Sequence, residues 1–295
     1  MEMNTIRSPE LQVSISPLSA ELMSIKDSDG VEYLWQGISP YWNRRAINLF
    51  PYIGRLTDGS YLYNGKLYKM TIHGFLPDSI MTVESASESS VCFFLRETRE
   101  TLESYPFPFE LRISYALAGT EIDISFDVHN TGNERMFFGI GGHPGFNVPL
   151  EQGLTFGDYC IEFTEKCTPM LVGMSEKCFP NGLDTDFPLP DGKTIPLSHE
   201  LFDNDAIILQ DACREVTLKS NKGRKSLAVA SPGMPYIGFW HNPKTEAPFV
   251  CIEPWTSLPS RDGVVEDIAR QPGLIGLEPG DRYINKWSIT ICRVR

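Results

Sequence analysis

One histidine stands where an apolar segment ends in glycines and a proline. The run 136–140 suits a buried strand, and Gly141 and Gly142 let the backbone bend or let another group approach closely. Pro144 lacks a backbone donor, so we expect the strand to stop there. His143 is therefore presented on stiff backbone at a strand end, where it can serve as a general acid or base. The structural alternative is a core histidine beside a β-bulge.

A glutamate occupies a comparable place later in the chain. Glu253 ends the apolar run 249–252, and Pro254 and Trp255 follow at once. A carboxylate in such a place is costly unless it is paired, so packing alone rarely explains it. We expect a catalytic or binding role for Glu253. The alternative is a structural partnership with a buried arginine or a backbone amide.

Three more ionisable residues lie among aromatics, glycines and prolines. Arg55 follows an Ile-Gly bend, His73 precedes Gly-Phe at the expected end of a strand, and Asp205 begins an apolar strand. Taken singly, each has an ordinary explanation: a salt bridge, a satisfied histidine and an aspartate that caps a turn. Their interest lies in their occurrence together with His143 and Glu253.

The motifs disfavour several other chemistries. Zinc accepts two histidines and one glutamate, which His73, His143 and Glu253 would offer, but the chain has no His-Glu-x-x-His and no close pair of histidines. We therefore expect no metal and no cofactor. A phosphate-binding glycine loop and a Gly-x-Ser-x-Gly nucleophile elbow are also absent.

Composition restricts the class of protein. The chain has 295 residues, 41% of them hydrophobic, which is enough for a large core. A formal charge of −12 disfavours a nucleic-acid or anionic membrane surface, so neither partner is expected. Seven scattered cysteines without a Cys-x-x-Cys pair indicate a reducing compartment. The first residues are unlike a signal peptide and no apolar run could span a bilayer, so we expect a cytoplasmic protein.

Alternation between apolar and polar residues dominates the chain. The runs 109–117 and 122–128 alternate strictly around a Gly-Thr turn, which predicts a hairpin with one buried face. Only 264–270 suggests a helical turn or two. So many short strands predict an all-β sandwich or barrel, and no linker or repeat divides 1–295, which we interpret as one domain. The other expected strands are 12–16, 21–26, 66–72, 81–85, 91–96, 160–163, 206–210, 215–219, 227–230, 236–240, 249–253 and 287–293.

The order of the unusual stretches resembles the aldose 1-epimerase (galactose mutarotase) family, and most closely its shorter LacX-like branch. The resemblance runs from about Ala46 to Trp255 and is expected to cover the whole chain. The most specific piece is Gly-His-Pro-x-Phe-Asn combined with a late glutamate at a strand end. The matching pieces are Ile-Gly-Arg at 53–55, His-Gly-Phe at 73–75, Gly-His-Pro-x-Phe-Asn at 142–147, the Asp205 strand and the Glu253 strand.

The resemblance implies a large antiparallel β-sandwich, a galactose mutarotase-like supersandwich, with an open polar cleft for a sugar. It implies an isomerase that interconverts the α and β anomers of a hexose, with His143 as general acid and Glu253 as general base. His73 and Arg55 would hold the sugar hydroxyls and ring oxygen. Asp205, or Asp203 two residues before it, would bind hydroxyls. A monomer or homodimer is expected.

The chemistry of mutarotation needs an ionised carboxylate and a protonated imidazole together. The base takes the proton of the C1 hydroxyl while the acid protonates the ring oxygen, so the ring opens and can reclose as the other anomer. From reference pKa values, Glu253 and His143 reach this state between about 4.3 and 6.5. We expect Arg55 to lower the pKa of Glu253, and the carboxylate to raise the pKa of His143.

Aromatic residues near these stretches are candidates for stacking on a sugar face. Phe75, Phe146 and Trp240 are such residues, with burial in the core as the alternative. The galactose-specific members of the family usually have tyrosine after His-Pro, whereas this chain has Gly145. The identity of the sugar is therefore left open.

Three other functions remain open. A hexose-6-phosphate mutarotase would need cations near the cleft, and a sugar-binding or regulatory protein would use the same cleft without turnover. A glycosidase or lyase would need two carboxylates, which Asp205 and Glu253 can provide. The arginines available to a phosphate are Arg44, Arg45, Arg96 and Arg99.

Overall fold

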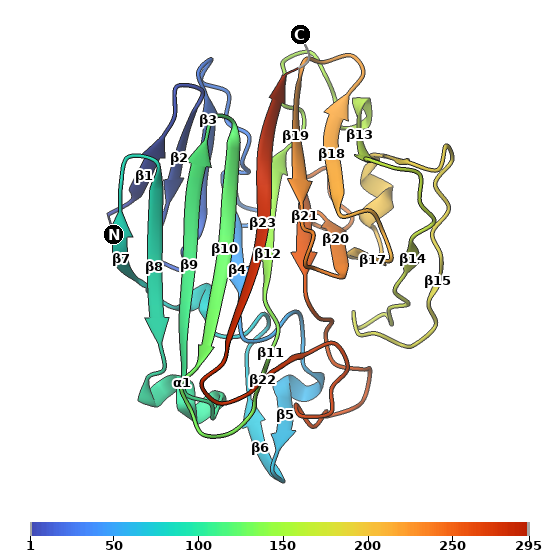
Figure 1. The fold of residues 1–295 in the computed structure, drawn as a ribbon. Helices are drawn as coiled ribbons and strands as arrows, with labels where there is room; N and C mark the ends of the chain where they lie inside the picture. Colours follow the sequence, from blue (N-terminus) through green and yellow to red (C-terminus); the bar gives the residue numbers. More distant parts are fainter. Residues whose placement is uncertain (1, 294–295) are drawn as a thin grey trace.

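A nine-stranded antiparallel sheet forms the front layer of the molecule in Figure 1. The computed structural model describes residues 2–293. The hairpin expected from the runs 109–117 and 122–128 is confirmed, with the apolar residues of both strands buried. In spatial order the strands are β16 (Thr194–Pro196), β13 (Tyr159–Phe163), β18 (Glu215–Ser220), β19 (Lys225–Ala230), β23 (Arg282–Arg293), β10 (Glu121–Asn130), β9 (Phe109–Ala118), β8 (Ser90–Arg96) and β7 (Thr82–Ala86).

A seven-stranded antiparallel sheet lies behind it, and the two sheets make the expected all-β sandwich (Figure 1). Its three adjacent strands β21, β12 and β4 are buried along almost their whole length. In spatial order the strands are β15 (Thr185–Asp186), β14 (Met170–Leu171), β17 (Ile207–Gln210), β20 (Tyr236–Trp240), β21 (Phe249–Trp255), β12 (Gly141–Asn147) and β4 (Ala46–Leu49).

Smaller elements surround the two sheets. Three of them are short sheets, and the helices among the described residues have at most six residues. Within residues 2–293, none is long and apolar enough to cross a membrane. The elements are β1 (Asn4–Arg7), β2 (Leu11–Ile15), β3 (Leu22–Asp27), β5 (Ser60–Tyr63), β6 (Lys66–Lys69), β11 (Met136–Phe138), β22 (Ile275–Leu277), α1 (Arg99–Ser104) and the 3-10 helices η1 (Thr57–Gly59), η2 (Leu76–Asp78), η3 (Phe156–Asp158) and η4 (His199–Phe202).

The interior is continuous between the sheets. One hydrophobic cluster includes residues from Ile6 to Ile291, and it draws on both layers. Glycine allows the closest contact between them: a β-carbon at Gly142 on β12 would lie 2.6 Å from the indole of Trp287 on β23. This is the close approach that the sequence predicts for the glycine pair. The organisation of 1–295 as one domain stays a prediction, with which this continuity agrees.

Three local expectations were wrong. The strand does not stop at Pro144, because β12 continues through it to Asn147. Likewise β21 runs past Glu253 and Pro254 to Trp255. Both prolines are accommodated because ladder hydrogen bonds on either side hold the strands in register. The segment Val264–Arg270, described throughout, forms turns and a β-bridge rather than a helix, and its backbone is hydrogen-bonded to Leu62 on β5.

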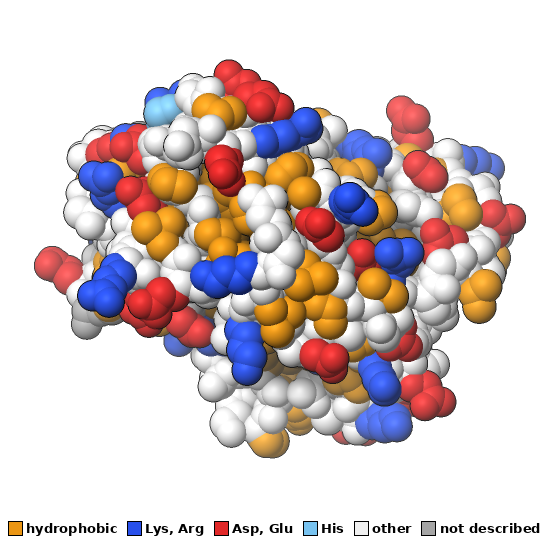
Figure 2. Space-filling view, turned by 90° about the horizontal axis from the view of Figure 1, so that it is seen from below, with side chains coloured by type: hydrophobic (Ala, Val, Ile, Leu, Met, Phe, Trp, Pro, Cys, Tyr) orange, Lys and Arg blue, Asp and Glu red, His pale blue; other side chains and the backbone are white. Residues whose placement is uncertain are grey.

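Charged side chains are mixed on the face seen in Figure 2. Lys and Arg side chains alternate there with Asp and Glu, and hydrophobic groups lie between them. Charged side chains of the protein also pair with one another, as Arg282 does with Asp127 and Arg112 does with Glu84. The acidic residues therefore do not form a continuous negative patch on this face.

A buried asparagine anchors β4, the strand that lies beside His143. The Asn48 side-chain amide donates to the carbonyls of Ser19 and Ala20 and to the Tyr115 hydroxyl, at 2.9, 3.0 and 2.9 Å. The Tyr115 hydroxyl donates in turn to the Ala20 carbonyl. Since Tyr115 belongs to β9, this network joins the seven-stranded sheet to the nine-stranded one.

We expect Asn48→Ala to lower the free energy of unfolding by roughly 2–4 kcal/mol, because each buried polar group left without a partner costs about 1–3 kcal/mol. Urea denaturation measures the loss. Asn43→Ala, at an exposed position close in sequence, is the control. A change of less than about 0.5 kcal/mol in Asn48→Ala, which is typical of surface positions, would contradict this role.

Candidate active site

His143 and Glu253 face one another because of the register between β12 and β21. Gly141 pairs with Trp255, and Gly145 pairs with Cys251. The same antiparallel register places His143 opposite Glu253, midway between these pairs. Side chains opposite one another in antiparallel strands have neighbouring β-carbons. Two residues separated by 110 positions are therefore brought together by the backbone pairing of central strands.

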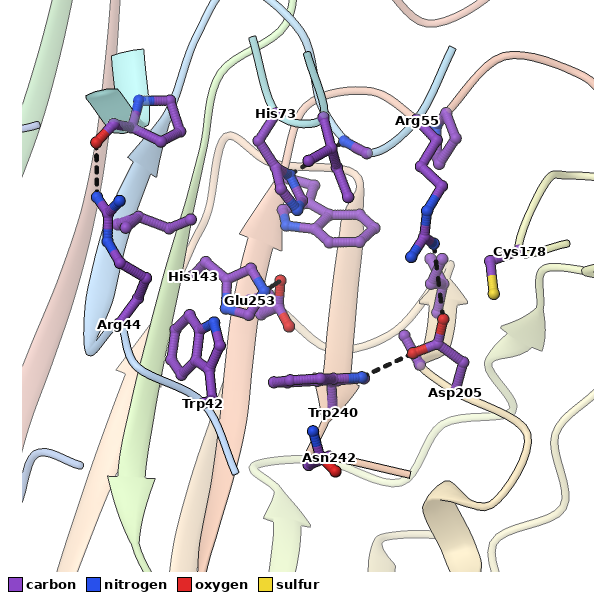
Figure 3. A pocket seen from close by; sticks show the side chains of 18 of the residues that line it. Trp42, Arg44, Arg55, His73, His143, Cys178, Asp205, Trp240, Asn242 and Glu253 are labelled. Atoms are coloured by element: carbon purple, nitrogen blue, oxygen red, sulfur yellow. Dashed lines mark hydrogen bonds and ion pairs between the residues drawn. The ribbon is translucent and has the colours of Figure 1, made fainter. Parts of the chain in front are cut away.

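A cavity of about 630 Å³ opens above this pair (Figure 3). Six of the seven candidate residues line it, namely Arg55, His73, His143, Asp205, Trp240 and Glu253. They come from β12, β20, β21, the loops that follow β4 and β6, and the loop that precedes β17. Its size fits a ligand pocket. Figure 3 shows their side chains converging on a common space from different elements.

The acid–base pair is buried and in close contact. His143 is 8% exposed and Glu253 is 1% exposed. The imidazole Nε2 lies 3.3 Å from carboxyl Oε2. Within the described chain, Oε2 of Glu253 and Nδ1 of His143 have no aligned hydrogen-bond partner. Each side chain thus keeps one buried polar atom without an aligned hydrogen bond.

Burial sets the charge of this pair, contrary to the sequence-based expectation. Burial and then the Asp205 carboxylate raise the pKa of Glu253 well above its ordinary range. Burial and then His73 lower the pKa of His143 well below its ordinary range. Arg55 does not act on Glu253 as expected, because its guanidinium lies 3.7 Å from Asp205. The neutral forms of both groups are therefore favoured.

Two turns that are far apart in sequence join to position His73. The backbone N–H of Gly54 donates to His73 Nδ1 at 3.1 Å, and the backbone N–H of His73 donates to the Gly54 carbonyl at 2.9 Å. His73 adopts a φ of +65°, which is uncommon for a residue with a side chain. Because Nδ1 accepts a hydrogen bond, the neutral ring carries its proton on Nε2. Burial and then Arg55 lower the pKa of His73 to about 4.

Asp205 is held by two different partners at the side of the cavity (Figure 3). The indole Nε1 of Trp240 donates to Oδ1 at 2.7 Å, and Arg55 approaches Oδ2. The alternative aspartate, Asp203, ends the 3-10 helix η4 instead. Asp205 is therefore the aspartate that the structure brings to the cavity.

Phe75 is the candidate that the structure places elsewhere. Its ring packs in the interior against Phe50, Tyr105 and Phe109, with centroids 5.7, 6.1 and 5.7 Å away. Phe146 is fully buried in the same core. His73, two residues earlier, lines the cavity instead. Of the stacking candidates, Trp240 is the one that lines the cavity.

Sequence reasoning missed Trp42, which packs directly on the acid–base pair. Its ring stacks on the imidazole of His143 with centroids 4.7 Å apart and an interplanar angle of 28°. It also meets Trp240 edge-on, at 5.8 Å. The signal available was the Tyr-Trp dipeptide in a polar segment just before a buried strand. Sequence reasoning also passed over Tyr41, Thr71, Met174, Cys178, Asn204 and Asn242, which line the cavity too.

The comparison with known families agrees with this geometry. The family model for aldose 1-epimerase matches residues 2–267. This chain belongs to the aldose 1-epimerase family. LacX proteins of Lactococcus lactis subsp. lactis, one chromosomal and one from a plasmid, are each 35% identical to it over 97% of this chain and 98% of their own length. The family expected from the sequence is thus confirmed.

Solved structures of family members have the same fold. A galactose mutarotase related enzyme from Lactobacillus acidophilus is 32% identical and superposes with a TM-score of 0.94, covering 100% of both chains. A galactose mutarotase-like protein from Lactobacillus casei is 31% identical, with a TM-score of 0.93 over 98% of this chain and 100% of that one. The galactose mutarotase-like fold is therefore shown along the chain.

The glycine that departs from the galactose-specific pattern has a structural reason. A β-carbon at Gly145 would lie 3.2 Å from the ring of Trp42, 3.3 Å from Trp35 and 3.4 Å from the sulfur of Cys251. A tyrosine there would have to displace this packing. In this member of the family, Trp42 occupies the space beside His143.

We expect His73 to remain neutral until the pH falls to about 4, because burial and the charge of Arg55 disfavour its protonated form. NMR titration of the imidazole signals measures this. Arg55→Gln should raise the pKa of His73, whereas Arg96→Gln, at an exposed ion pair, should leave it unchanged. Titration of wild-type His73 near 6.5 would contradict the assignment.

Proposed function

We propose that this protein is an aldose 1-epimerase that interconverts the anomers of a hexose, with His143 as acid and Glu253 as base. The observation that carries the proposal is the 3.3 Å approach of His143 Nε2 and Glu253 Oε2 at the wall of the cavity. The oxygen that loses a proton and the ring oxygen that gains one are bonded to the same sugar carbon. The two catalytic groups must therefore be neighbours, as these are.

The pair holds the proton that the reaction moves. A neutral imidazole beside a protonated carboxyl carries as many protons as an imidazolium beside a carboxylate. The two states differ only in which of the two groups holds the proton, and their heavy atoms lie 3.3 Å apart. A sugar that donates its C1 hydroxyl to Glu253 and accepts at its ring oxygen from His143 favours the ionised state. Substrate binding thus prepares the pair for ring opening.

Both catalytic groups return to their starting state within one cycle. Glu253 takes the proton of the C1 hydroxyl as His143 protonates the ring oxygen, and the C1–O5 bond breaks to give the open-chain aldehyde. Rotation about C1–C2 presents the other face of the carbonyl. On reclosure, Glu253 returns its proton to the carbonyl oxygen and His143 recovers its proton from the O5 hydroxyl. Neither a covalent intermediate nor a redox step is needed.

The remaining cavity residues suit the hydroxyls and faces of a pyranose. The Nε2–H of His73 is a donor, and the carboxylate of Asp205 is an acceptor fixed by Trp240. Trp42 and Trp240 meet edge-on and provide apolar walls for the C–H faces of a sugar. Rigid donors and acceptors reduce the loss of entropy when the substrate is bound.

Charge in the cavity favours a neutral hexose over a hexose 6-phosphate. Of the four arginines considered for a phosphate, Arg44 is the one that lines the cavity. It is already engaged with Glu21 at 3.2 Å, with Asp78 at 3.4 Å and with the carbonyl of Pro77. Arg55 is likewise paired with Asp205. A phosphate would have to compete with a carboxylate for either cation.

We expect His143→Ala and Glu253→Gln each to lower kcat/KM for mutarotation by roughly 10²–10⁴-fold, the usual contribution of a positioned proton-transfer group. Polarimetry of freshly dissolved α-glucose or α-galactose measures the rate. His129→Ala on β10 and Glu246→Gln at an exposed loop position are matched controls. Wild-type rates in either cavity variant would overturn the proposed function.

Glu253→Gln should inactivate without destabilising the fold. The folded-state pKa of Glu253 is raised, so its contribution to stability is present at low pH and is lost as the pH rises towards the folded-state pKa. The amide cannot ionise and avoids this loss. We expect the unfolding temperature of the variant at neutral pH to equal or exceed that of the wild type, as measured by calorimetry. A lower value would show that the carboxyl has a structural role.

We expect a bell-shaped pH dependence of kcat/KM, because the reactive pair must hold one proton. The lowered pKa of His143 places the acidic limb below 6.5, and the raised pKa of Glu253 places the alkaline limb above 4.5. Polarimetry in a series of buffers tests this. A rate that keeps rising through alkaline pH would exclude a protonated pair as the catalyst.

A further inference from the structure

A buried cysteine lies beside the acid–base pair. Cys251 and Glu253 are two residues apart on β21, so their side chains point to the same face of the sheet. His143 is opposite Glu253 and diagonal to Cys251 across the strand pair. One ligand atom from each of the three residues lies within 4.8 Å of the other two. Of the seven cysteines, Cys251 is the one that is fully buried.

Cysteine, histidine and glutamate are all residue types that coordinate zinc in proteins. Thiolate, imidazole and carboxylate bind Zn²⁺ at about 2.3, 2.0 and 2.0–2.2 Å, and ligand atoms around a tetrahedral ion therefore lie roughly 3.5 Å apart. The 3.3 Å between His143 Nε2 and Glu253 Oε2 already fits. Gly145 faces Cys251 across the strands, so no side chain intervenes there. Small rotations of the side chains would complete the set.

One proposed ligand atom lacks a partner. Oε2 of Glu253 is buried without a hydrogen bond among the described residues, which is a cost that proteins usually avoid. A cysteine that only filled space at position 251 would not relieve the cost of this unpartnered atom. Since His143 and Glu253 line the cavity, a fourth coordination position would face the space where a sugar binds.

We propose that Cys251, His143 and Glu253 bind a thiophilic divalent cation of the zinc class, and that the bound ion switches off the acid–base pair. The sequence argued against a metal because it has no His-Glu-x-x-His and no close pair of histidines, whereas the structure adds Cys251 as a third ligand. Binding forms bonds from sulfur, nitrogen and carboxylate oxygen to the ion. It releases the thiol proton and the proton of the pair to solvent, so the affinity rises with pH. No electron is transferred.

The ion acts by occupying the groups that move protons. The lone pair of His143 and the carboxylate of Glu253 are both used in coordination. The inhibitory half of this inference rests on the proposed function, whereas the binding half does not. Two separate measurements on the full-length, metal-free protein therefore test it.

The first measurement is zinc binding, by competition with a chromophoric zinc chelator. Wild type should bind one ion, and Cys251→Ala should bind it about 100-fold more weakly or worse, since even residues outside the first shell of a metal change affinity 10–100-fold. Cys178→Ala is the matched control, because that thiol lines the same cavity outside the set. Equal affinities in wild type and Cys251→Ala would overturn the proposed site.

The second measurement is the mutarotation rate with and without zinc. Cys251→Ala should keep the wild-type rate without metal and should resist zinc, and EDTA should restore zinc-inhibited wild type. Zinc binding that leaves the wild-type rate unchanged would overturn the inhibition while the site stands. Binding lost with Cys251 in a protein that has no mutarotase activity would reject the proposed function alone.

Discussion

The burial of two ionisable side chains against one another is the constraint on which this structure depends. His143 and Glu253 are enclosed by strands that are covered on both faces, so neither can be ionised at low cost by itself. One proton shared between them keeps the pair neutral overall. The same arrangement gives the pair its chemistry, since moving that proton between the groups requires only short displacements. If the pair were exposed, each group would exchange its proton with water instead of with the other group.

The surroundings of the pair follow from the same two strands. Gly141, Gly142 and Gly145 leave room for Trp255, Trp287 and Trp42, whose rings close the space around β12. Turns then bring the groups that can hold a substrate: the bend at Gly54 supports His73, and Trp240 supports Asp205. Rigid strands thus carry His143 and Glu253, whereas loops carry His73 and Asp205.

The catalytic candidates were visible in the sequence because they break local rules. A glutamate ending an apolar strand and a histidine between glycines and proline have no ordinary packing reason to be there. Six of the seven candidates line the cavity. Trp42 and Cys251 were missed because an aromatic residue and an isolated thiol are ordinary in any core. Phe75 was misplaced because its ring packs against Phe109 in the core, whereas His73, two residues earlier, lines the cavity.

By itself, the sequence determined the strand pattern, the family and the residues whose chemistry is unusual, because alternation and motif spacing are local properties. Only the tertiary structure decided what those residues meet. The pairing of β12 with β21 set His143 against Glu253 and Cys251, and Arg55 went to Asp205 instead of to Glu253. Charge states depend on burial and on neighbours distant in sequence. These emerge only when the chain is folded, which is why the expected directions of both pKa shifts were reversed.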